Sequence, residues 1–240
     1  MRPDLLQGRD ATFLLRWLIK AMVVPHLAEL VDYVTHLFPK LTPAERRISI
    51  ALYRLLAEGR PVKRAALAVK AELPLEKVSE VLGNWYGVFY DAAGDVIGYW
   101  GLALGKMNHR MRINGRTLYA WCAWDTLFLP RLIGAVAQVE STCPVSGGTI
   151  RLKVSPRGVE TVEPTSTLVS FVMPDRAKVE QNIVLSFCHH VHFFKSADVA
   201  QRWLVGRSAT QLLTVNEAWM LGLEKNTTQY DDDLELASVE

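Results

Sequence analysis

Apolar residues recur at helical spacing through the first part of the chain. One or two helices are predicted up to about residue 40, from an apolar face formed by Leu14, Leu15, Leu18 and Met22. The next helix has a clear beginning, because Thr42 can cap it, Pro43 suits its first position and Glu45 completes a capping box. Two shorter helices are predicted over about 63–73 and from residue 75 onward.

After residue 87 the pattern changes to short alternating segments. A hairpin is predicted with its turn at 91–95, and three short helices followed by a hairpin resemble a winged helix-turn-helix. Asn114 and Gly115 predict a second hairpin turn, and strands are predicted at 135–142, 149–156, 158–164 and 166–174. A short helix or turn is expected over 122–132, stopped near Pro130, and helices are expected around 198–205 and 216–224.

These elements predict an α+β protein, with a small helical, winged-helix-like N-terminal domain followed by a mixed α+β domain that contains antiparallel strands. The expected division is an N-terminal helical extension over 1–40, the winged-helix-like domain over 41–104 and the core over 105–224. The acidic, polar stretch 225–240 is expected to be a frayed or disordered tail.

Composition and charge narrow the class of protein. Half of the 240 residues are hydrophobic, 22% are charged and the net charge is +2, so neither nucleic acid nor membrane is an expected partner. The apolar N-terminal stretch is too interrupted for a membrane span and lacks the features of a signal peptide. Three cysteines without a CxxC pair indicate free thiols rather than disulfides or structural zinc. A cytoplasmic location is therefore expected.

The winged-helix pattern suggests a DNA-binding regulator as one alternative. The third helix would have to contact the groove, yet "PLEKVSEVLGN" offers Glu76 and Glu80 against a single Lys77. Groove-facing helices normally carry Arg, Lys, Asn or Gln at base-contacting positions, so DNA binding is disfavoured.

The stretch "LYAWCAWDTLFLP" places Cys122 three residues before Asp125 in an apolar, aromatic run. If a helix begins near Cys122, both side chains lie on one face, and a thiol at a helix N-terminus has its pKa lowered. A reactive thiolate beside a buried acid is one interpretation. The other is a structural cysteine with Asp125 as an N-terminal cap.

The stretch "SFCHHVHFF" carries another cysteine and three histidines. If it is extended, Cys188, His190 and His192 share one face, which would suit a transition-metal site. The alternative is that the histidines bond to backbone groups and the cysteine packs as a small apolar side chain.

Together, these segments resemble the organomercurial (alkylmercury) lyases. The resemblance also includes "VSP" with "VEP" after it, the hairpin "YDAAGDVIGY" and "EGRPVKRAALA", and it runs from about residue 43 to about 222. It implies a fold in which the helical, winged-helix-like N-terminal domain is packed on a mixed α+β catalytic core. It also implies protonolysis of a carbon–mercury bond, which yields a hydrocarbon and Hg(II).

The resemblance carries over residue by residue. Cys122 and Cys188 match the two catalytic cysteines, Asp125 matches the catalytic aspartate, and Cys143 matches a cysteine regarded as structural. Some members have a further cysteine directly after the second catalytic one, where this chain has His189. That departure leaves the two-thiol site intact.

In the implied mechanism, Cys122 or Cys188 first captures the organomercurial as a thiolate, and both sulfurs then bind mercury. Asp125, whose pKa burial should raise so that it can hold a proton at neutral pH, takes the proton released from the second thiol and delivers it to carbon. Cys122, Asp125 and Cys188 are thus the expected substrate-binding residues, and Hg(II) stays between the two cysteines until small thiols or a mercuric reductase remove it. No organic cofactor and no catalytic metal is expected.

Other side chains near the cysteines are given supporting roles. Trp121 and Phe187 directly precede the two catalytic cysteines and are expected to form walls of the pocket. His190 and His192 are expected to be structural rather than mercury ligands. A metal-responsive regulator and a non-catalytic thiol and histidine metal-binding protein are the alternative functions.

Overall fold

The structure is a computed structural model that describes residues 25–38, 40–207, 209–230 and 234. The helix expected on Leu14, Leu15, Leu18 and Met22 lies outside these residues. Among the residues that are described, no helix is long and apolar enough to cross a membrane.

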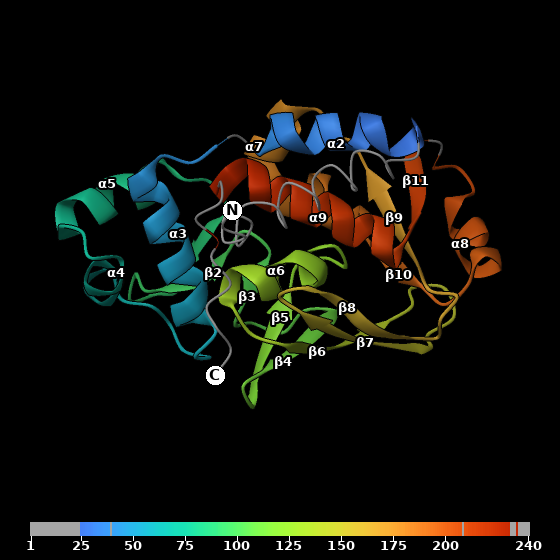
Figure 1. Ribbon diagram of the computed structural model, residues 1–240, viewed down its shortest axis with the longest axis horizontal. Coiled ribbons are helices and arrows are strands. Elements are labelled where there is room, and N and C mark those ends of the chain that lie inside the picture. Colours follow the sequence, from blue (N-terminus) through green and yellow to red (C-terminus); the bar gives the residue numbers. More distant parts are fainter. Residues whose placement is uncertain (1–24, 39, 208, 231–233, 235–240) are drawn as a thin grey trace, which may run out of the picture.

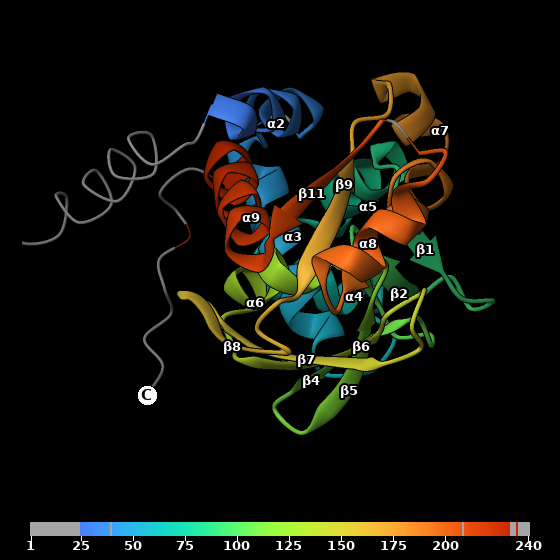
Figure 2. The same ribbon diagram turned by 90° about the vertical axis from the view of Figure 1, so that its right-hand side faces the viewer.

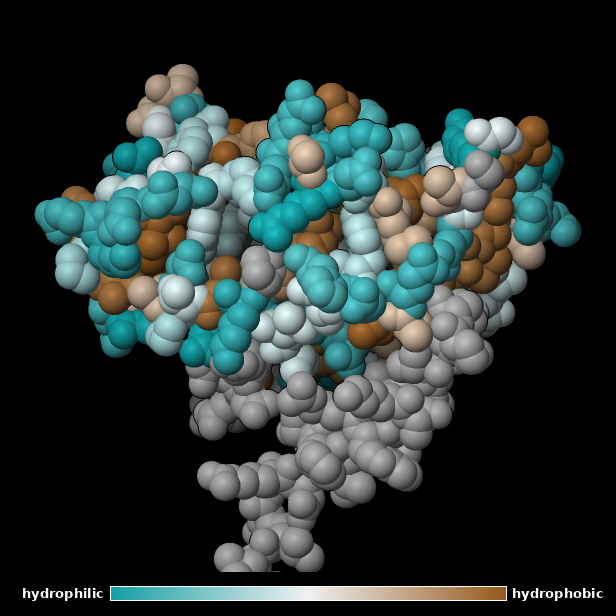
Figure 3. Space-filling view, turned by 90° about the horizontal axis from the view of Figure 1, so that it is seen from above, coloured by the Kyte–Doolittle hydropathy of each residue, from teal (hydrophilic) through white to brown (hydrophobic). Residues whose placement is uncertain are grey.

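Within the residues that the structure describes, four helices precede the first strand: α2 (Pro25–Leu37), α3 (Pro43–Leu56), α4 (Arg64–Ala71) and α5 (Leu75–Asn84). The predicted capping box is confirmed. The Thr42 N–H donates to the Glu45 carboxylate at 2.9 Å, and the Glu45 N–H donates to the Thr42 hydroxyl at 3.3 Å. Seen from the side on which α2 lies, the surface is mostly hydrophilic, with hydrophobic residues showing between the polar ones (Figure 3).

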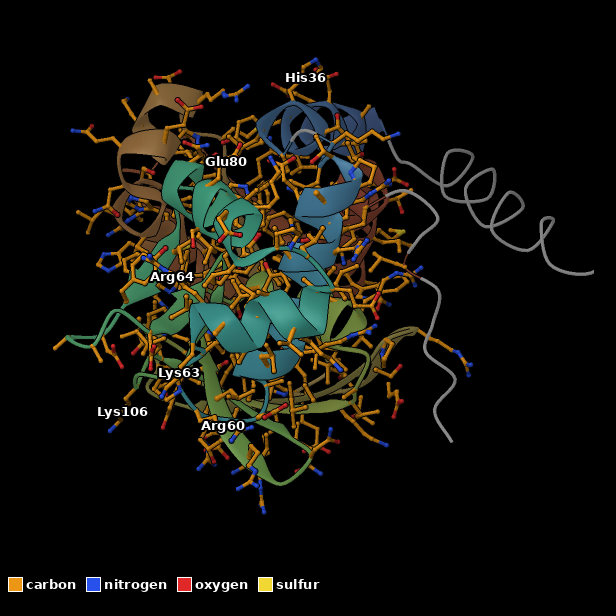
Figure 4. All side chains as sticks on the ribbon, turned by 90° about the vertical axis from the view of Figure 1, so that its left-hand side faces the viewer. His36, Arg60, Lys63, Arg64, Glu80 and Lys106 are labelled. Carbon is orange, nitrogen blue, oxygen red and sulfur yellow. The ribbon has the colours of Figure 1, made fainter. Side chains whose placement is uncertain are left out.

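The helical unit α3–α5 does not present a basic face on its third helix. Figure 4 shows Arg60, Lys63 and Arg64 around the beginning of α4, away from Glu80 on α5. Lys77, the one basic residue of α5, is paired with Glu80 at 3.0 Å. Helix α5 therefore has no excess of basic side chains for contact with a DNA groove, and the absence of DNA binding stays a prediction.

Eight strands form one antiparallel sheet in the order β1-β2-β3-β5-β4-β6-β7-β8. Their bounds are β1 (Val88–Tyr90), β2 (Val96–Tyr99), β3 (Leu102–Ala103), β4 (His109–Ile113), β5 (Arg116–Ala120), β6 (Ala137–Thr142), β7 (Thr149–Ser155) and β8 (Gly158–Glu163). Asn114 and Gly115, at φ +47° and +75°, form the predicted tight turn between β4 and β5. The first predicted hairpin consists of β1 and β2 and lies at one edge of this sheet, where β2 pairs with β3. The sheet is thus continuous across residue 104, where a domain boundary was expected, and that division stays a prediction.

The remaining elements build a second layer. A three-stranded sheet has the order β10-β9-β11. The elements are α6 (Asp125–Ile133), β9 (Leu168–Val172), α7 (Arg176–Ser186), the 3₁₀ helix η1 (Cys188–His190), β10 (Phe193–Phe194), α8 (Ala197–Leu204), β11 (Thr210–Thr214) and α9 (Val215–Tyr230). Helix α9 packs between α2 and α6, and α6 in turn lies against the large sheet (Figures 1 and 2). The α+β class with antiparallel strands is therefore confirmed.

Three local predictions are wrong. Helix α9 continues to Tyr230, so residues 225–230 are not a frayed tail; the Tyr230 and Ser49 hydroxyls form a buried hydrogen bond of 2.7 Å that ties this end to α3. A short helix was predicted here with its end near Pro130, but α6 passes through Pro130 and ends at Ile133, with Gly134 as its C-cap at φ +79°. The stretch 186–194 is not one extended strand, because α7 ends at Ser186 and a 3₁₀ turn follows.

Candidate active site

The turn between β5 and α6 holds Cys122 and Asp125. The Trp121 N–H donates to the Gly101 carbonyl at 2.9 Å and so ties the turn to the loop after β2. The Cys122 N–H donates to Asp125 Oδ2 at 2.8 Å. Asp125 is the first residue of α6, and its carboxylate accepts from the residue three positions before it. Trp124 occupies the N-cap position and no side chain caps the helix, so the interpretation of Asp125 as an N-terminal cap is wrong. The same contact directs the carboxylate towards the Cys122 thiol.

Cys188 reaches this turn from the 3₁₀ segment after α7. The Ala123 N–H donates to the Val191 carbonyl at 3.2 Å, which joins the two segments although they lie far apart in the sequence. The sulfurs of Cys122 and Cys188 and a carboxylate oxygen of Asp125 all lie within 4.8 Å of one another. The three side chains are only 0%, 4% and 6% exposed in the order Cys122, Cys188 and Asp125. The structure therefore brings together the three residues predicted to carry the chemistry.

Gly101 packs directly against the acid. Its φ is +96°, and a Cβ at this position would lie 2.5 Å from Asp125 Oδ1. Any side chain here would displace the carboxylate and strain the backbone. The sequence "YWGLAL" carries no signal for this role, which depends on a contact made only in the folded chain.

An aromatic cluster surrounds the site on the side of α6. The ring of Trp124 contacts four other rings, with centroids 4.9–5.9 Å away: Phe38, Phe128, Phe171 and Phe187. Trp121 packs edge-on against Phe89, with centroids 5.1 Å apart. Trp121 and Phe187 thus belong to different aromatic contacts, and their role as pocket walls stays a prediction.

Burial raises the pKa of Asp125 from 3.8 to about 6. The hydrogen bonds from Cys122 and the positive charge of Lys225 act in the opposite direction and limit the rise. The expectation that burial raises this pKa is therefore confirmed in direction. A carboxyl group with this pKa is still mainly ionised at pH 7. Contrary to the prediction, Asp125 therefore does not hold a proton in the resting site at neutral pH.

Both thiols have raised pKa values. Burial raises the pKa of Cys122 well above its ordinary value, and the neighbouring Cys188 and Asp125 add to this effect. A hydrogen bond with Cys122 lowers the pKa of Cys188, but burial and the Asp125 charge outweigh it. The lowering expected at a helix N-terminus does not occur, because Cys122 precedes α6 and is fully buried.

Lys225 on α9 was missed because it was assigned to the polar tail. The side chain is 2% exposed, and its ammonium lies 4.2 Å from the centroid of the Phe128 ring. Burial lowers the pKa of Lys225 to about 7, while the Asp125 carboxylate acts to raise it. A lysine in a polar stretch carries no sequence signal for burial, and only the packing of α9 on α6 places it here.

The remaining predicted residues lie apart from this cluster. His189 and His190 are exposed on η1, and the His192 ring nitrogen Nε2 lies 2.8 Å from the His189 carbonyl oxygen. The row formed by Cys188, His190 and His192 therefore does not exist, because η1 is not extended. Cys143 is buried in a separate turn. Its N–H donates to the Gly148 carbonyl at 2.9 Å and closes this turn.

Comparison with known proteins agrees with this site. The family model of alkylmercury lyase matches residues 102–225, which include all three clustered side chains. An alkylmercury lyase from Staphylococcus epidermidis is 41% identical over 171 residues, covering 71% of this chain and 77% of that protein. One from Pseudomonas putida is 42% identical over 173 residues, covering 72% and 80%.

The fold has a counterpart among solved structures. A crystal structure of the mercury-bound form of MerB2 superposes with a TM-score of 0.67 at 24% identity, covering 82% of this chain and 97% of that one. This likeness concerns the fold alone. The sequence relatives and the family model carry the assignment, and the chain belongs to the alkylmercury lyase family.

Proposed function

We propose that this protein cleaves the carbon–mercury bond of organomercury compounds by protonolysis and releases a hydrocarbon and Hg(II). The observation that carries the proposal is the buried cluster of two thiols and one carboxyl group, with the ligating atoms within 4.8 Å of one another. Thiolates suit a soft metal such as mercury, and a carboxyl group within hydrogen-bond reach can transfer the proton that the reaction needs.

The resting protonation states suggest how the reaction proceeds. One thiol replaces the ligand that the organomercurial brings with it, and its proton leaves with that ligand. The ionised Asp125 then takes the proton of the second thiol, whose sulfur also binds mercury. Asp125 delivers this proton to carbon, so that the electron pair of the carbon–mercury bond forms the new carbon–hydrogen bond. Hg(II) stays on both sulfurs.

We infer that Cys188 binds mercury first and that Cys122 supplies the proton. Cys122 is fully buried, its pKa is the more strongly raised by burial, and its thiol is hydrogen-bonded to Asp125. Loss of its proton therefore requires an acceptor at short range, and Asp125 is that acceptor. Cys188 is slightly exposed, and its hydrogen bond with Cys122 favours its thiolate.

The proposed reaction uses no organic cofactor and no resident metal ion. Small thiols, or a mercuric reductase, would take Hg(II) from the two sulfurs and return the site to its starting state. All three cysteines are free, which suits a reducing, cytoplasmic setting.

The test is release of hydrocarbon gas from methylmercury, and of benzene from phenylmercury, in excess small thiol. Wild-type protein should release both, and Cys122→Ala and Cys188→Ala should release neither. Cys143→Ser is the matched control, because this buried cysteine lies outside the cluster, and it should retain turnover. Asp125→Asn should still bind mercury but release hydrocarbon far more slowly.

Three results would contradict the proposal. Wild-type turnover by either alanine variant would exclude the two-thiol mechanism. Mercury uptake without hydrocarbon would indicate a non-catalytic metal-binding protein. Specific retention of a promoter fragment at physiological salt, again without hydrocarbon, would indicate a regulator.

A further inference from the structure

A cavity bounded by α2, α3 and α9 is separate from the cluster of two thiols and one carboxyl group. Its volume is about 200 Å³, and none of Cys122, Asp125 and Cys188 lines it. Residues of α7, of the end of α5 and of the segment after β2 complete its wall. The protein therefore has room for a small molecule at a second place.

Aromatic rings form much of the wall of this cavity. Seven of its lining residues are aromatic, and several of these rings hold one another in place. The rings of Trp85 and Tyr99 stack with their centroids 5.2 Å apart. The rings of Tyr86 and Trp100 meet edge-on at 4.8 Å. A wall of rings in fixed positions suits a flat apolar group, above all another aromatic ring.

The ammonium group of Lys225 lines the same cavity without a counter-ion in contact. The side chain is 2% exposed, and among the residues that the structure describes no carboxylate forms an ion pair with it. Its hydrogen bond to Asn226 Oδ1 is long, at 3.4 Å. Three aromatic rings surround it, with centroids 4.2–5.8 Å away: Phe38, Phe128 and Tyr230. An ammonium has three N–H donors, so most of the hydrogen-bonding capacity of this buried charge is unused.

The other charged residues of the lining already have partners. Glu45 Oε2 accepts from the Thr42 N–H at 2.9 Å and from the Thr42 hydroxyl at 2.7 Å. Arg176 Nε donates to Glu180 at 2.7 Å. With Lys40 included, three basic residues and one acidic residue line the cavity, so its charge favours an anion.

We propose that this cavity binds a small aromatic carboxylate, whose carboxylate group accepts hydrogen bonds from the Lys225 ammonium while its ring lies against the aromatic wall. Such hydrogen bonds between two charged groups are the contacts that Lys225 lacks within the protein. Because a cavity of about 150 Å³ accommodates benzene, one of about 200 Å³ has room for a single ring with one small substituent. The site is separate from the proposed reaction, and its test needs no turnover.

The experiment measures the binding of benzoate at pH 6, where Lys225, with a pKa of about 7, is mainly charged. Trp85 and Trp100 line the cavity, so tryptophan fluorescence reports binding, and calorimetry checks it. Wild-type protein should bind benzoate saturably at one site. Lys225→Met, which replaces the ammonium with an apolar group, should weaken this binding at least about tenfold. Lys70→Met, at an exposed position on α4, is the matched control and should bind benzoate as wild-type protein does.

A second variant fills the cavity and leaves Lys225 in place. Leu41 is a half-buried residue of the lining, and Leu41→Trp adds bulk there. This variant should also lose benzoate binding, although it removes no charge. Equal affinity for benzoate in wild-type protein, Lys225→Met and Leu41→Trp would overturn the proposal, as would the absence of saturable binding to wild-type protein.

Two further probes test the class of ligand. Benzyl alcohol has the ring without the charge, and inorganic phosphate has the charge without the ring. Each should bind to wild-type protein at least about tenfold more weakly than benzoate does. If either one bound as tightly as benzoate, the proposed class of ligand would be wrong.

A variant of the thiol cluster tests whether the two sites are separate. Cys188 does not line the cavity, so Cys188→Ala should bind benzoate with wild-type affinity. Loss of benzoate binding in a folded Cys188→Ala protein would place the ligand at the thiols and overturn the proposal. Because the measurement is binding alone, its result does not depend on whether the protein releases hydrocarbon from organomercurials.

Discussion

Replacing Asp125 with asparagine removes a buried charge and leaves the shape of the side chain almost unchanged. An amide oxygen can accept the bond that the Cys122 N–H donates to Asp125 Oδ2 at 2.8 Å. The carboxyl group is 6% exposed, and burial raises its pKa from 3.8 to about 6. In the unfolded chain the pKa returns to its ordinary value. The folded state therefore disfavours the ionised form.

The size and sign of the effect follow from linkage. A raised pKa means that the folded protein binds this proton more tightly than the unfolded chain does. The stability that this gives is present below about pH 3.8 and is lost as the pH rises through about 6. A pKa difference of 1 between the folded and unfolded states corresponds to about 1.4 kcal/mol. As the pH rises, wild-type protein therefore loses about 3 kcal/mol of folding stability that Asp125→Asn does not lose.

Urea unfolding in the presence of a reducing agent measures this difference, best at pH 4 and pH 8. At pH 4 Asp125 is mainly protonated, and at pH 8 Lys225, with a pKa of about 7, is mainly neutral. At each of these two pH values one of the two groups is uncharged, so the attraction between them contributes little. The free energy of unfolding of Asp125→Asn, relative to wild type, should rise by about 2 kcal/mol from pH 4 to pH 8. Glu76→Gln, at an exposed position on α5, should show no such trend. A flat or falling difference for Asp125→Asn would refute the argument that burial controls this acid.

Two further predictions concern the residues packed around Asp125. Gly101→Ala should fold with a loss of about 1–2 kcal/mol and lose most of its turnover, because the new Cβ would lie 2.5 Å from Asp125 Oδ1. Gly115→Ala, also at positive φ but with no atom within 4 Å, should lose similar stability in urea unfolding yet keep its kcat; equal kcat in the two variants would contradict a role for Gly101. Burial lowers the pKa of Lys225 from 10.5 to about 7, so wild-type protein loses stability as the pH falls towards 7. Lys225→Met should therefore gain about 2 kcal/mol relative to wild type between pH 9 and pH 6 in urea unfolding, and the absence of any gain would show that the ammonium is not desolvated.

The elements that the sequence predicts well have their determinants within a few residues. The capping box of Thr42 and Glu45 and the Asn114–Gly115 turn are local features, and the structure contains both. Alternation of apolar residues likewise predicts β6, β7, β8 and β9. None of these elements needs a distant contact to select its conformation.

The elements that the sequence predicts poorly depend on distant contacts. The last turns of α9 are polar and carry little helical patterning, but Tyr230 bonds to Ser49 from α3 and holds them in place. The stretch around Cys188 alternates like a strand. It forms a 3₁₀ turn instead, and the hydrogen bond from the Ala123 N–H to the Val191 carbonyl holds this turn against the segment that carries Cys122. In both places tertiary packing overrides the local pattern.

The candidate site divides in the same way. The spacing of Cys122 and Asp125 indicates a shared face from the sequence alone, but it left open whether the aspartate is a cap or an acid. The structure places Trp124 at the N-cap position, so Asp125 is not the cap; it is a buried acid that lies beside both thiols. The pairing with Cys188, some 66 residues later, came from the family resemblance and not from spacing.

The surroundings of Asp125 suit a group that must accept a proton and then give it away. Burial alone would raise the pKa of Asp125 further, so that the group would already carry a proton at neutral pH and could not accept one from Cys122. The bonds from Cys122 and the charge of Lys225 act against burial and leave the pKa at about 6, where the resting carboxylate is ionised. Once mercury neutralises the thiolate charges, the protonated acid faces a carbon that is gaining negative charge, and transfer to carbon becomes favourable. Lys225, for whose burial the sequence carries no signal, is thus one of the groups that keep Asp125 able both to accept a proton and to give it away.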